Sequence, residues 1–443
     1  MKPIESPYKT FRFKDYSFDH ETGEAIFHYS FDKEIQFEER LIFPLPVEGI
    51  PAGVDEALDR ALFALHLMAG ISYYKAYCPS EIIIESGVLT RDEAEFWNNL
   101  YTLGLGEFFY QNDLEFKDYI HFPFSDATKR SYGRAEGEGS FVAIGGGKDS
   151  LVTIELLRRV QKDFTMFALG EHTRIHEVAA AVGGDLVTVK RVLDPRLFEL
   201  NAANAYNGHV PISAYIAFMS VVLAILHSKR DVILSNERSA NFGNVVVQGV
   251  IINHQYSKSL QFESDFQAYL LHSITPDISY FSLLRPFSEL KISEMFSKYL
   301  DYFDVFSSCN KNFKLTHDKV GAIWCGECPK CAFVFAMLSA FVEKDRLVKI
   351  FGDNLFDRED LLPLFRELLG ACEVKPFECV GEPSEVVAAF ELARRRGDFN
   401  ETLVMKYFIE NVLPNQNVEL EIKKALEVSE DHLIPEVYSE VIA

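Results

Sequence analysis

The sequence lacks a long apolar run. Its longest, about residues 212–226, is shorter than the roughly 20 residues that a membrane-spanning helix needs, so it indicates a buried helix. The first six residues are not followed by the apolar stretch of a signal peptide. We therefore expect a cytoplasmic protein with no membrane partner.

Basic residues are also scarce. The chain has 44 Lys and Arg against 66 Asp and Glu, a formal net charge of -22, and it contains no Lys/Arg-rich run. Such a chain repels phosphate backbones, so nucleic acid is a disfavoured partner. A small anionic substrate in a local basic pocket stays compatible with this charge.

Apolar residues, in contrast, are plentiful. The chain has 443 residues, of which 48% are hydrophobic and 25% charged. This balance suits one large or two to three ordinary domains and argues against disorder. We find no internal repeat, and no pattern in the sequence indicates an oligomeric state.

The first 125 residues predict an α+β region. Apolar and polar residues alternate on both sides of a polar break at 20–23, which indicates a β-hairpin, and 39–43 continues as a third strand. We expect a helix from Asp55 to about Met68, a short strand at 82–84 and a capping box at 90–93 that opens a second helix. Residues 125–139 are typical of a linker or a mobile loop.

From residue 140 the expected strands and helices alternate. The strands are expected at 141–144, 164–169, 186–189 and 232–234, and the helices at 151–159, 175–182 and 212–226. This order predicts an α/β fold, a doubly wound parallel sheet with right-handed crossovers, over residues 140–335. Residues 336–443 have helical spacing and predict a C-terminal helical region.

A glycine-rich loop joins the first of these strands to its helix, with the residues Gly145, Gly146, Gly147, Lys148, Asp149 and Ser150. Glycines let backbone N–H groups approach an anion, and the following helix points its positive end at the same place. Lys148 adds a full charge, Ser150 a hydroxyl donor, and Asp149 a capping carboxylate or a magnesium contact. The Walker A pattern fails because Asp149 follows Lys148, and the dinucleotide pattern fails because position 150 is Ser.

This loop resembles the S-G-G-x-D-S loop of the N-type ATP pyrophosphatases, the PP-loop enzymes, with Gly145 in place of the first Ser. The resemblance implies a Rossmann-like core that holds the β,γ-pyrophosphate of ATP while a substrate oxygen attacks the α-phosphorus. It also implies ATP and Mg²⁺ as cofactors, and AMP and pyrophosphate as products. Gly145 loses one hydroxyl contact but leaves the backbone cradle intact.

Two further segments fall where a doubly wound sheet keeps its site. Asn236, Glu237 and Arg238 follow the expected strand at 232–234, at a carboxyl strand end. Residues 207–211, which include His209, precede the expected helix at 212–226. Either segment could instead be only a polar helix cap.

Four cysteines cluster late in the chain, at Cys309, Cys325, Cys328 and Cys331. Four thiolates with two overlapping C-x-x-C spacings suit a structural, tetrahedral zinc ion. An iron–sulfur cluster is the competing interpretation, and His317 could replace one cysteine. The other cysteines, Cys78, Cys372 and Cys379, are interpreted as buried small hydrophobes.

The glycine loop and the four cysteines together resemble the 7-cyano-7-deazaguanine synthase family, which activates a carboxylate with ATP and has a similar zinc site. That resemblance implies an ATP-dependent ligase or amidase as an alternative function. A non-catalytic nucleotide-binding protein is a further alternative.

More of the chain resembles the UDP-N-acetylmuramoyl-L-alanyl-L-glutamate epimerase family, MurL. The matching segments are residues 69–75, 145–150, 207–211, 236–241, 254–259 and 324–331. The resemblance implies that the terminal L-Glu of UDP-MurNAc-L-Ala-L-Glu is converted to D-Glu through an acyl-adenylate, in the synthesis of a peptidoglycan precursor.

Under this resemblance, Lys148, Asp149 and Ser150 act on the phosphates of ATP. The sequence does not single out the acid and the base at Cα; the candidates are His209, Glu237, His254, Tyr256 and Lys258, of which His209 and His254 are kept as catalytic. The expected substrate contacts are Asn236, Glu237, Arg238, Tyr256 and Lys258, with Arg238 and Lys258 as counter-charges for an anionic substrate.

Overall fold

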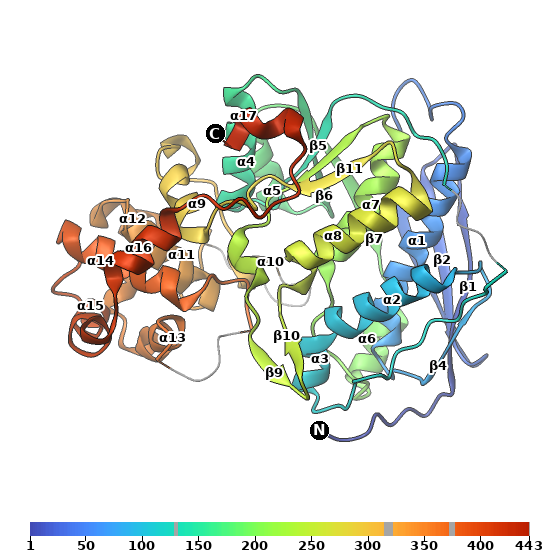
Figure 1. Ribbon diagram of the computed structural model, residues 1–443, viewed down its shortest axis with the longest axis horizontal. Coiled ribbons are helices and arrows are strands. Elements are labelled where there is room, and N and C mark those ends of the chain that lie inside the picture. Colours follow the sequence, from blue (N-terminus) through green and yellow to red (C-terminus); the bar gives the residue numbers. More distant parts are fainter. Residues whose placement is uncertain (128–131, 314–321, 372–376, 443) are drawn as a thin grey trace.

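A computed structural model describes residues 1–127, 132–313, 322–371 and 377–442. Its main sheet has nine strands: β1 (Thr10–Phe18), β2 (Glu24–Phe31), β3 (Ile35–Ile42), β4 (Glu81–Ile84), β5 (Ser140–Ala143), β6 (Phe164–Leu169), β7 (Leu186–Val192), β8 (Asp231–Leu234) and β11 (Ser279–Ser282). Their spatial order is β11-β8-β5-β6-β7-β3-β2-β1-β4 (Figure 1). The five strands from β11 to β7 pair in parallel, so the expected α/β fold with a parallel sheet is confirmed.

The N-terminal strands extend the same sheet. β1 and β2 form the expected hairpin, the expected third strand β3 pairs antiparallel with β2, and β3 also pairs antiparallel with β7, where Leu41 faces Arg191. The short strand β4 lies parallel to β1 at the far edge. The predicted division into residues 1–125, 140–335 and 336–443 stays a prediction.

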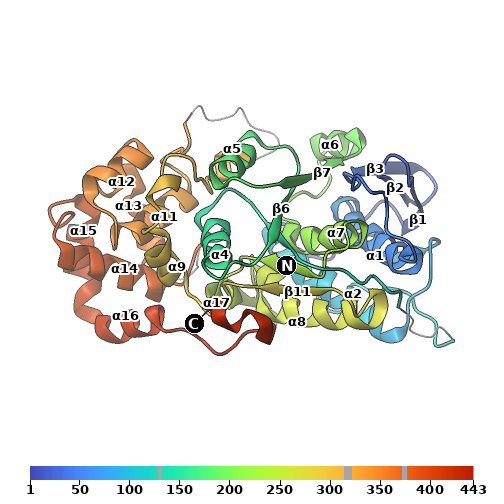
Figure 2. The ribbon, with the colours of Figure 1, turned by 90° about the horizontal axis from the view of Figure 1, so that it is seen from above.

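Helices cover both faces of the parallel part. The helix α1 (Asp55–Tyr74) packs against α7 (Ile212–Leu226) on one face, and α4 (Lys148–Arg159), α5 (Thr173–Val182) and α9 (Glu289–Phe296) cover the other (Figure 2). Successive strand residues alternate between these faces: Phe141 and Val232 lie in the core under α1 and α7, while Val142 and Ile233 lie in the core under α4. Both faces of these strands are therefore buried, as parallel sheets require.

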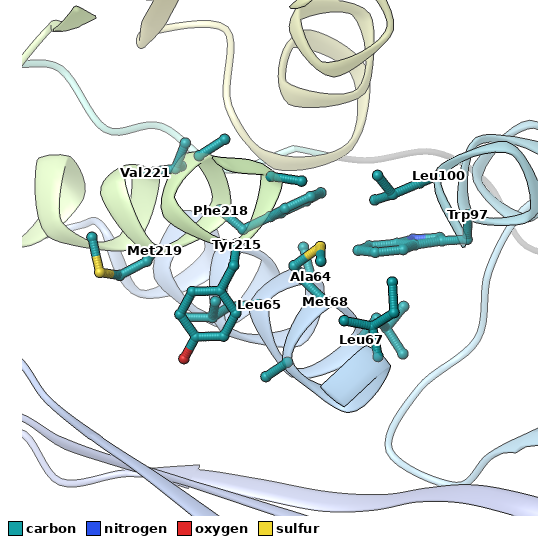
Figure 3. Packing of buried hydrophobic residues seen from close by; sticks show 14 of the residues in the cluster. Ala64, Leu65, Leu67, Met68, Trp97, Leu100, Tyr215, Phe218, Met219 and Val221 are labelled. Atoms are coloured by element: carbon teal, nitrogen blue, oxygen red, sulfur yellow. The ribbon is translucent and has the colours of Figure 1, made fainter. Parts of the chain in front are cut away.

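Aromatic packing fixes the first of these cores. The helix α2 (Arg91–Gly104) opens with the predicted capping box, in which the Thr90 side chain accepts from the Glu93 N–H and the Glu93 carboxylate accepts from the Thr90 N–H. It carries Trp97, whose indole stacks on Phe218 of α7 with ring centroids 5.0 Å apart (Figure 3). α1 runs six residues beyond its expected end at Met68, because its last turns are also buried in this core.

The C-terminal third is helical, as expected. Its helices are α11 (Pro329–Ser339), α12 (Lys344–Phe351), α13 (Leu362–Leu368), α14 (Pro383–Arg396), α15 (Leu403–Tyr407), α16 (Val418–Leu426) and α17 (Ser439–Ile442). After α16 the chain returns to the sheet, where α17 contacts α4 and the Tyr438 hydroxyl donates to Asp231 Oδ2 at 2.7 Å (Figure 1). The sequence did not predict this return.

Several other elements were also not predicted: α3 (Gly106–Gln111), α6 (Pro195–Ala202), α8 (Leu260–Tyr269), α10 (Asn310–Phe313), β11 and a separate hairpin of β9 (Val245–Val247) and β10 (Val250–Ile252). Most of them are short or half-exposed, so their apolar periodicity is weak. Within the described ranges, no helix is both long and apolar enough to cross a membrane.

Candidate active site

The glycine loop lies at the carboxyl end of β5 and leads directly into α4. Gly146 has φ +84°, a left-handed conformation that favours glycine, and its carbonyl accepts from the Ser307 N–H at 2.9 Å. Gly147 is the N-cap of α4 and brings no side chain that could cap the helix. The first N–H groups of α4 are therefore not capped by a side chain, which is the arrangement that binds an anion at a helix N-terminus.

The loop sits at the switch point of the sheet. β6 lies on one side of β5 and β8 on the other, so the crevice between the carboxyl ends of β5 and β8 is where such sheets bind ligands. The segment after β8 reaches this crevice, since Ser235 Oγ lies 2.8 Å from Thr153 Oγ1 of α4. Next in this segment, Asn236 donates to Ser282 Oγ at 2.9 Å and the Glu237 side chain is buried.

Lys148 is buried and held by two carboxylates. Its ammonium group bonds to Glu289 at the start of α9 and to Asp149, and Lys330 Nζ lies 3.4 Å from the other oxygen of Glu289. Burial alone would lower the pKa of Lys148, but Asp149 and Glu289 raise it, so Lys148 is charged. Burial would raise the pKa of Glu289, but the charges of Lys148 and Lys330 outweigh burial and lower this pKa.

A second group of titratable side chains comes from four distant parts of the chain. His254 uses Nδ1 to bond the buried Glu107 of α3, and its Nε2 lies 3.6 Å from Cys379 Sγ. The His209 ring lies against the His254 ring, with centroids 4.5 Å apart, and its Nδ1 is 3.6 Å from Glu107 Oε2. Lys258 Nζ donates to Cys379 Sγ at 3.4 Å.

These contacts set the charges of the group. Burial raises the pKa of the Cys379 thiol, but Lys258 and His254 outweigh it and lower this pKa to about 5. Burial lowers the pKa of His254, but Cys379 and Glu107 raise it to about 9. At neutral pH the two side chains are therefore a thiolate and an imidazolium. His209 is neutral, because burial, followed by the nearby cations His254 and Lys258, lowers its pKa to about 3.

Arg285 ties the two groups of site residues together. It is fully buried and donates to the carbonyls of Glu237 at 2.7 Å and Lys258 at 2.6 Å, while it pairs with Glu263 at 2.8 Å. Burial and then Glu289 raise the pKa of Glu237, whereas Lys258 opposes this shift. One guanidinium thus orients two of the predicted substrate contacts.

The four predicted metal ligands meet. The Sγ atoms of Cys309, Cys325, Cys328 and Cys331 all lie within 4.8 Å of one another, with Cys331 3.4 Å from Cys328 and 3.6 Å from Cys325. A tetrahedral zinc ion with Zn–S bonds of about 2.3 Å has S···S edges of about 3.8 Å, so these residues fit one such ion. Cys325 Sγ also accepts from the Glu327 and Cys328 N–H groups, which orients the sulfur.

Lys330 connects the cysteines to the rest of the site. It lies between Cys328 and Cys331, and its Nζ donates to the Cys379 carbonyl at 2.5 Å besides facing Glu289. The order of contacts from the glycine loop is therefore Lys148, Glu289, Lys330 and Cys379.

Two predicted substrate contacts are not part of these clusters. Arg238 donates to the carbonyls of Lys424 at 2.8 Å and Glu427 at 3.1 Å, at the end of α16. The ring of Tyr256 is buried against Phe262, with centroids 6.0 Å apart. Ser150 donates its hydroxyl to the Gly147 carbonyl at 3.0 Å, within the loop. The remaining predicted side chains lie in the two clusters: Lys148, Asp149 and Glu237 in the first, and His209, His254 and Lys258 in the second.

The interpretation of Cys379 as a buried hydrophobe was wrong, because the residue is only half-buried and its thiol contacts His254 and Lys258. Cys78 is buried, as expected, whereas Cys372 and His317 lie outside the described residues. Sequence reasoning missed Glu107, Arg285, Glu289 and Lys330. Only Lys330 carried a local signal, its place inside the cysteine motif.

Comparisons with known proteins agree over most of the chain. Two family models match, the MurL N-terminal domain over residues 4–283 and the MurL C-terminal domain over residues 305–423. A UDP-N-acetyl-alpha-D-muramoyl-L-alanyl-L-glutamate epimerase of Xanthomonas oryzae pv. oryzae is 38% identical over 428 residues, 96% of this chain and 95% of that protein. Proteins of the same name from a Micromonospora species and from Salinispora tropica are 39% and 37% identical, each over 91% of this chain and over 90% and 88% of their own lengths.

Proposed function

The chain belongs to the MurL family, and from this premise we propose that it converts the terminal L-Glu of UDP-MurNAc-L-Ala-L-Glu to D-Glu. It is thus an isomerase that acts on a peptidoglycan precursor, and its place is the cytoplasm. We further propose that ATP drives the reaction and leaves as AMP and pyrophosphate. The observation that carries the ATP requirement is the uncapped N-terminus of α4 with the buried, charged Lys148 beside it, at the switch point of the sheet.

The chemistry explains why an epimerase would use ATP. A free carboxylate already carries a negative charge and resists a second one on the neighbouring carbon. Joining the α-carboxylate to AMP removes that charge and makes the carbonyl electron-withdrawing, so the Cα–H becomes acidic enough for a side-chain base. The planar enolate then takes a proton on the opposite face, and water releases AMP.

The residues divide by their place in the site. The α4 amides, Lys148 and Ser150 hold the pyrophosphate in a PP-loop core, and the half-buried Asp149 supplies a ligand for Mg²⁺, which neutralises phosphate charge when bound. Asn236, Glu237 and Lys258 contact the substrate, and His254 with its neighbours handles the proton at Cα. The two groups are linked through Glu289 and Lys330.

The four cysteines hold a structural zinc ion in this proposal. Their sulfur donors and spacing favour zinc. Because Lys330 lies between Cys328 and Cys331, the ion also restricts the position of this lysine. With the cysteines held, Lys330 is fixed on the Cys379 carbonyl and on Glu289.

The test is a reaction in deuterated water with ATP and the dipeptide nucleotide. Epimerisation places deuterium at the glutamyl Cα and releases AMP and pyrophosphate. A ligase or amidase of the 7-cyano-7-deazaguanine synthase type would instead form an amide with ammonia and leave the Cα–H untouched. Absence of both deuterium and pyrophosphate release would refute the proposal and favour a non-catalytic nucleotide-binding protein.

A further inference from the structure

A cysteine, a histidine and a glutamate line up between α3 and the segment before α14. Glu107 and His254 are 147 residues apart in the chain, and His254 and Cys379 are 125 apart. The carboxylate faces Nδ1 of the imidazole, and the thiol sulfur faces Nε2. Both ring nitrogens of His254 are therefore occupied by groups that favour its protonated form.

We infer that Cys379 is a catalytic residue that takes up the proton from the glutamyl Cα, with His254 and Lys258 as the positioning cations of its sulfur. This inference rests on the proposed function and names one of its acid–base groups. Because neither the spacing nor the sequence around Cys379 forms a motif, only the contacts point to it.

The position of Cys379 suits this role. Its backbone carbonyl is bonded by Lys330, which faces Glu289, which in turn bonds the Lys148 ammonium of the glycine loop. The backbone of Cys379 is thus linked through three contacts to Lys148 of the glycine loop. Cys379 is a half-buried residue, and Lys258 and His254 face its sulfur and keep it charged.

The charged and titratable groups around the sulfur come from several elements. They are Lys258 and His254 from one segment, Lys330 from α11 and Glu378 from its own segment. Three of these four groups carry positive charge, which lowers the pKa of the thiol despite its burial.

A metal ion is the competing interpretation of part of this cluster. Glu107, His209 and His254 present ligand atoms within 4.8 Å of one another. However, Nδ1 of both histidines faces the same oxygen of Glu107, and His254 Nδ1 is hydrogen-bonded to it. The geometry therefore favours a hydrogen-bonded relay from Glu107 through His254 to the thiol.

The step is a proton transfer without redox change. The Cα–H bond breaks, its electron pair enters the enolate of the activated acid, and the proton forms S–H on Cys379. A second proton donor then protonates Cα on the opposite face. The thiol then loses its proton to solvent, and because His254 keeps its own proton throughout, the thiolate–imidazolium pair is restored.

The first test separates activation from proton exchange in Cys379→Ser and Cys379→Ala. Substrate-dependent exchange of labelled pyrophosphate into ATP reports activation, and deuterium at the glutamyl Cα reports the proton step. We expect pyrophosphate exchange within about threefold of wild type, and deuterium incorporation lower by roughly 100-fold or more, the usual scale of general acid–base catalysis. Cys78→Ser, at a buried thiol outside this cluster, is the matched control and should keep the wild-type ratio of the two rates.

The outcomes are separable. If both rates survive in the Cys379 variants, or if both are lost in variants with wild-type thermal stability, the inference is overturned. If wild-type protein shows neither rate, the proposed function itself fails and the inference fails with it. A loss confined to deuterium incorporation supports both.

A second measurement needs no activity. Iodoacetamide labelling of the wild-type chain, mapped by peptide mass spectrometry from pH 4 to 10, should give Cys379 a midpoint below the ordinary thiol value of about 8.5, while Cys78 stays unlabelled in the folded protein. His254→Gln should move the midpoint upward. An ordinary midpoint in wild type, or loss of a second metal equivalent in His254→Gln, would overturn the inference.

Discussion

Replacing Arg285 by Lys tests how the site is held in place. The guanidinium has two terminal nitrogens, one on the Glu237 carbonyl and the other on the Lys258 carbonyl and Glu263. A lysine keeps the charge next to Glu263, but its single nitrogen cannot reach both carbonyls, so at least one buried carbonyl loses a charged donor. A hydrogen bond to a charged group contributes about 1.5–3 kcal/mol, so we expect the free energy of unfolding to fall by about 2–3 kcal/mol.

The same change should lower activity, because Glu237 and Lys258 lose a shared anchor. We expect deuterium incorporation at the glutamyl Cα to fall by roughly 10- to 100-fold. Urea unfolding followed by tryptophan fluorescence gives the stability, since Trp97 and Trp324 lie in the two different cores.

Arg230→Lys is the matched control. Arg230 pairs with Asp231, but its side chain is 51% exposed, so this exchange should change stability by less than about 0.5 kcal/mol. If Arg285→Lys behaves like this control in both measurements, Arg285 does not hold the site together.

Three further predictions follow from single contacts. Lys148→Met should lower pyrophosphate release by roughly 100-fold or more without loss of bound metal, and unchanged release would exclude Lys148 from phosphate binding. Cys331→Ser should remove one zinc per chain in atomic absorption and lower deuterium incorporation, because Lys330 loses its fixed position; full activity without metal would contradict this. Burial raises the pKa of Glu385 from 4.5 to about 8, although its hydrogen bond from Ser239 opposes the shift. The folded state therefore holds the Glu385 proton more tightly than the unfolded state, so the free energy of unfolding falls as the pH rises from 4.5 to about 8. Urea titrations at pH 5 and pH 8 should show a smaller fall in Glu385→Gln, and an equal fall in both proteins would exclude this carboxyl as its source.

Local patterns were reliable where one segment suffices. The alternation of apolar residues predicted the hairpin of β1 and β2, and the capping box at Thr90 was confirmed in atomic detail. The strand–glycine–helix order placed the loop at the end of β5, as observed. Each of these features depends on neighbours within a few residues, which a sequence displays directly.

Patterns were less informative where a side chain's direction decides its role. Arg238 and Tyr256 lie in segments that reach the site, but the Arg238 guanidinium bonds α16 and the Tyr256 ring enters the core. Cys379 was misinterpreted for the same reason: a lone cysteine in sequence gives no sign that an imidazole and an ammonium group face it.

By itself, the sequence determined the α/β class, the glycine-rich loop between β5 and α4 and the four-cysteine cluster, because each is written in contiguous residues or close spacings. The tertiary structure alone decided that Glu289 partners Lys148 and that Glu107, His254 and Cys379 form a relay. These partners are more than a hundred residues apart, and the pKa shifts of Lys148, His254 and Cys379 arise from burial and facing charges that exist only once the chain has folded.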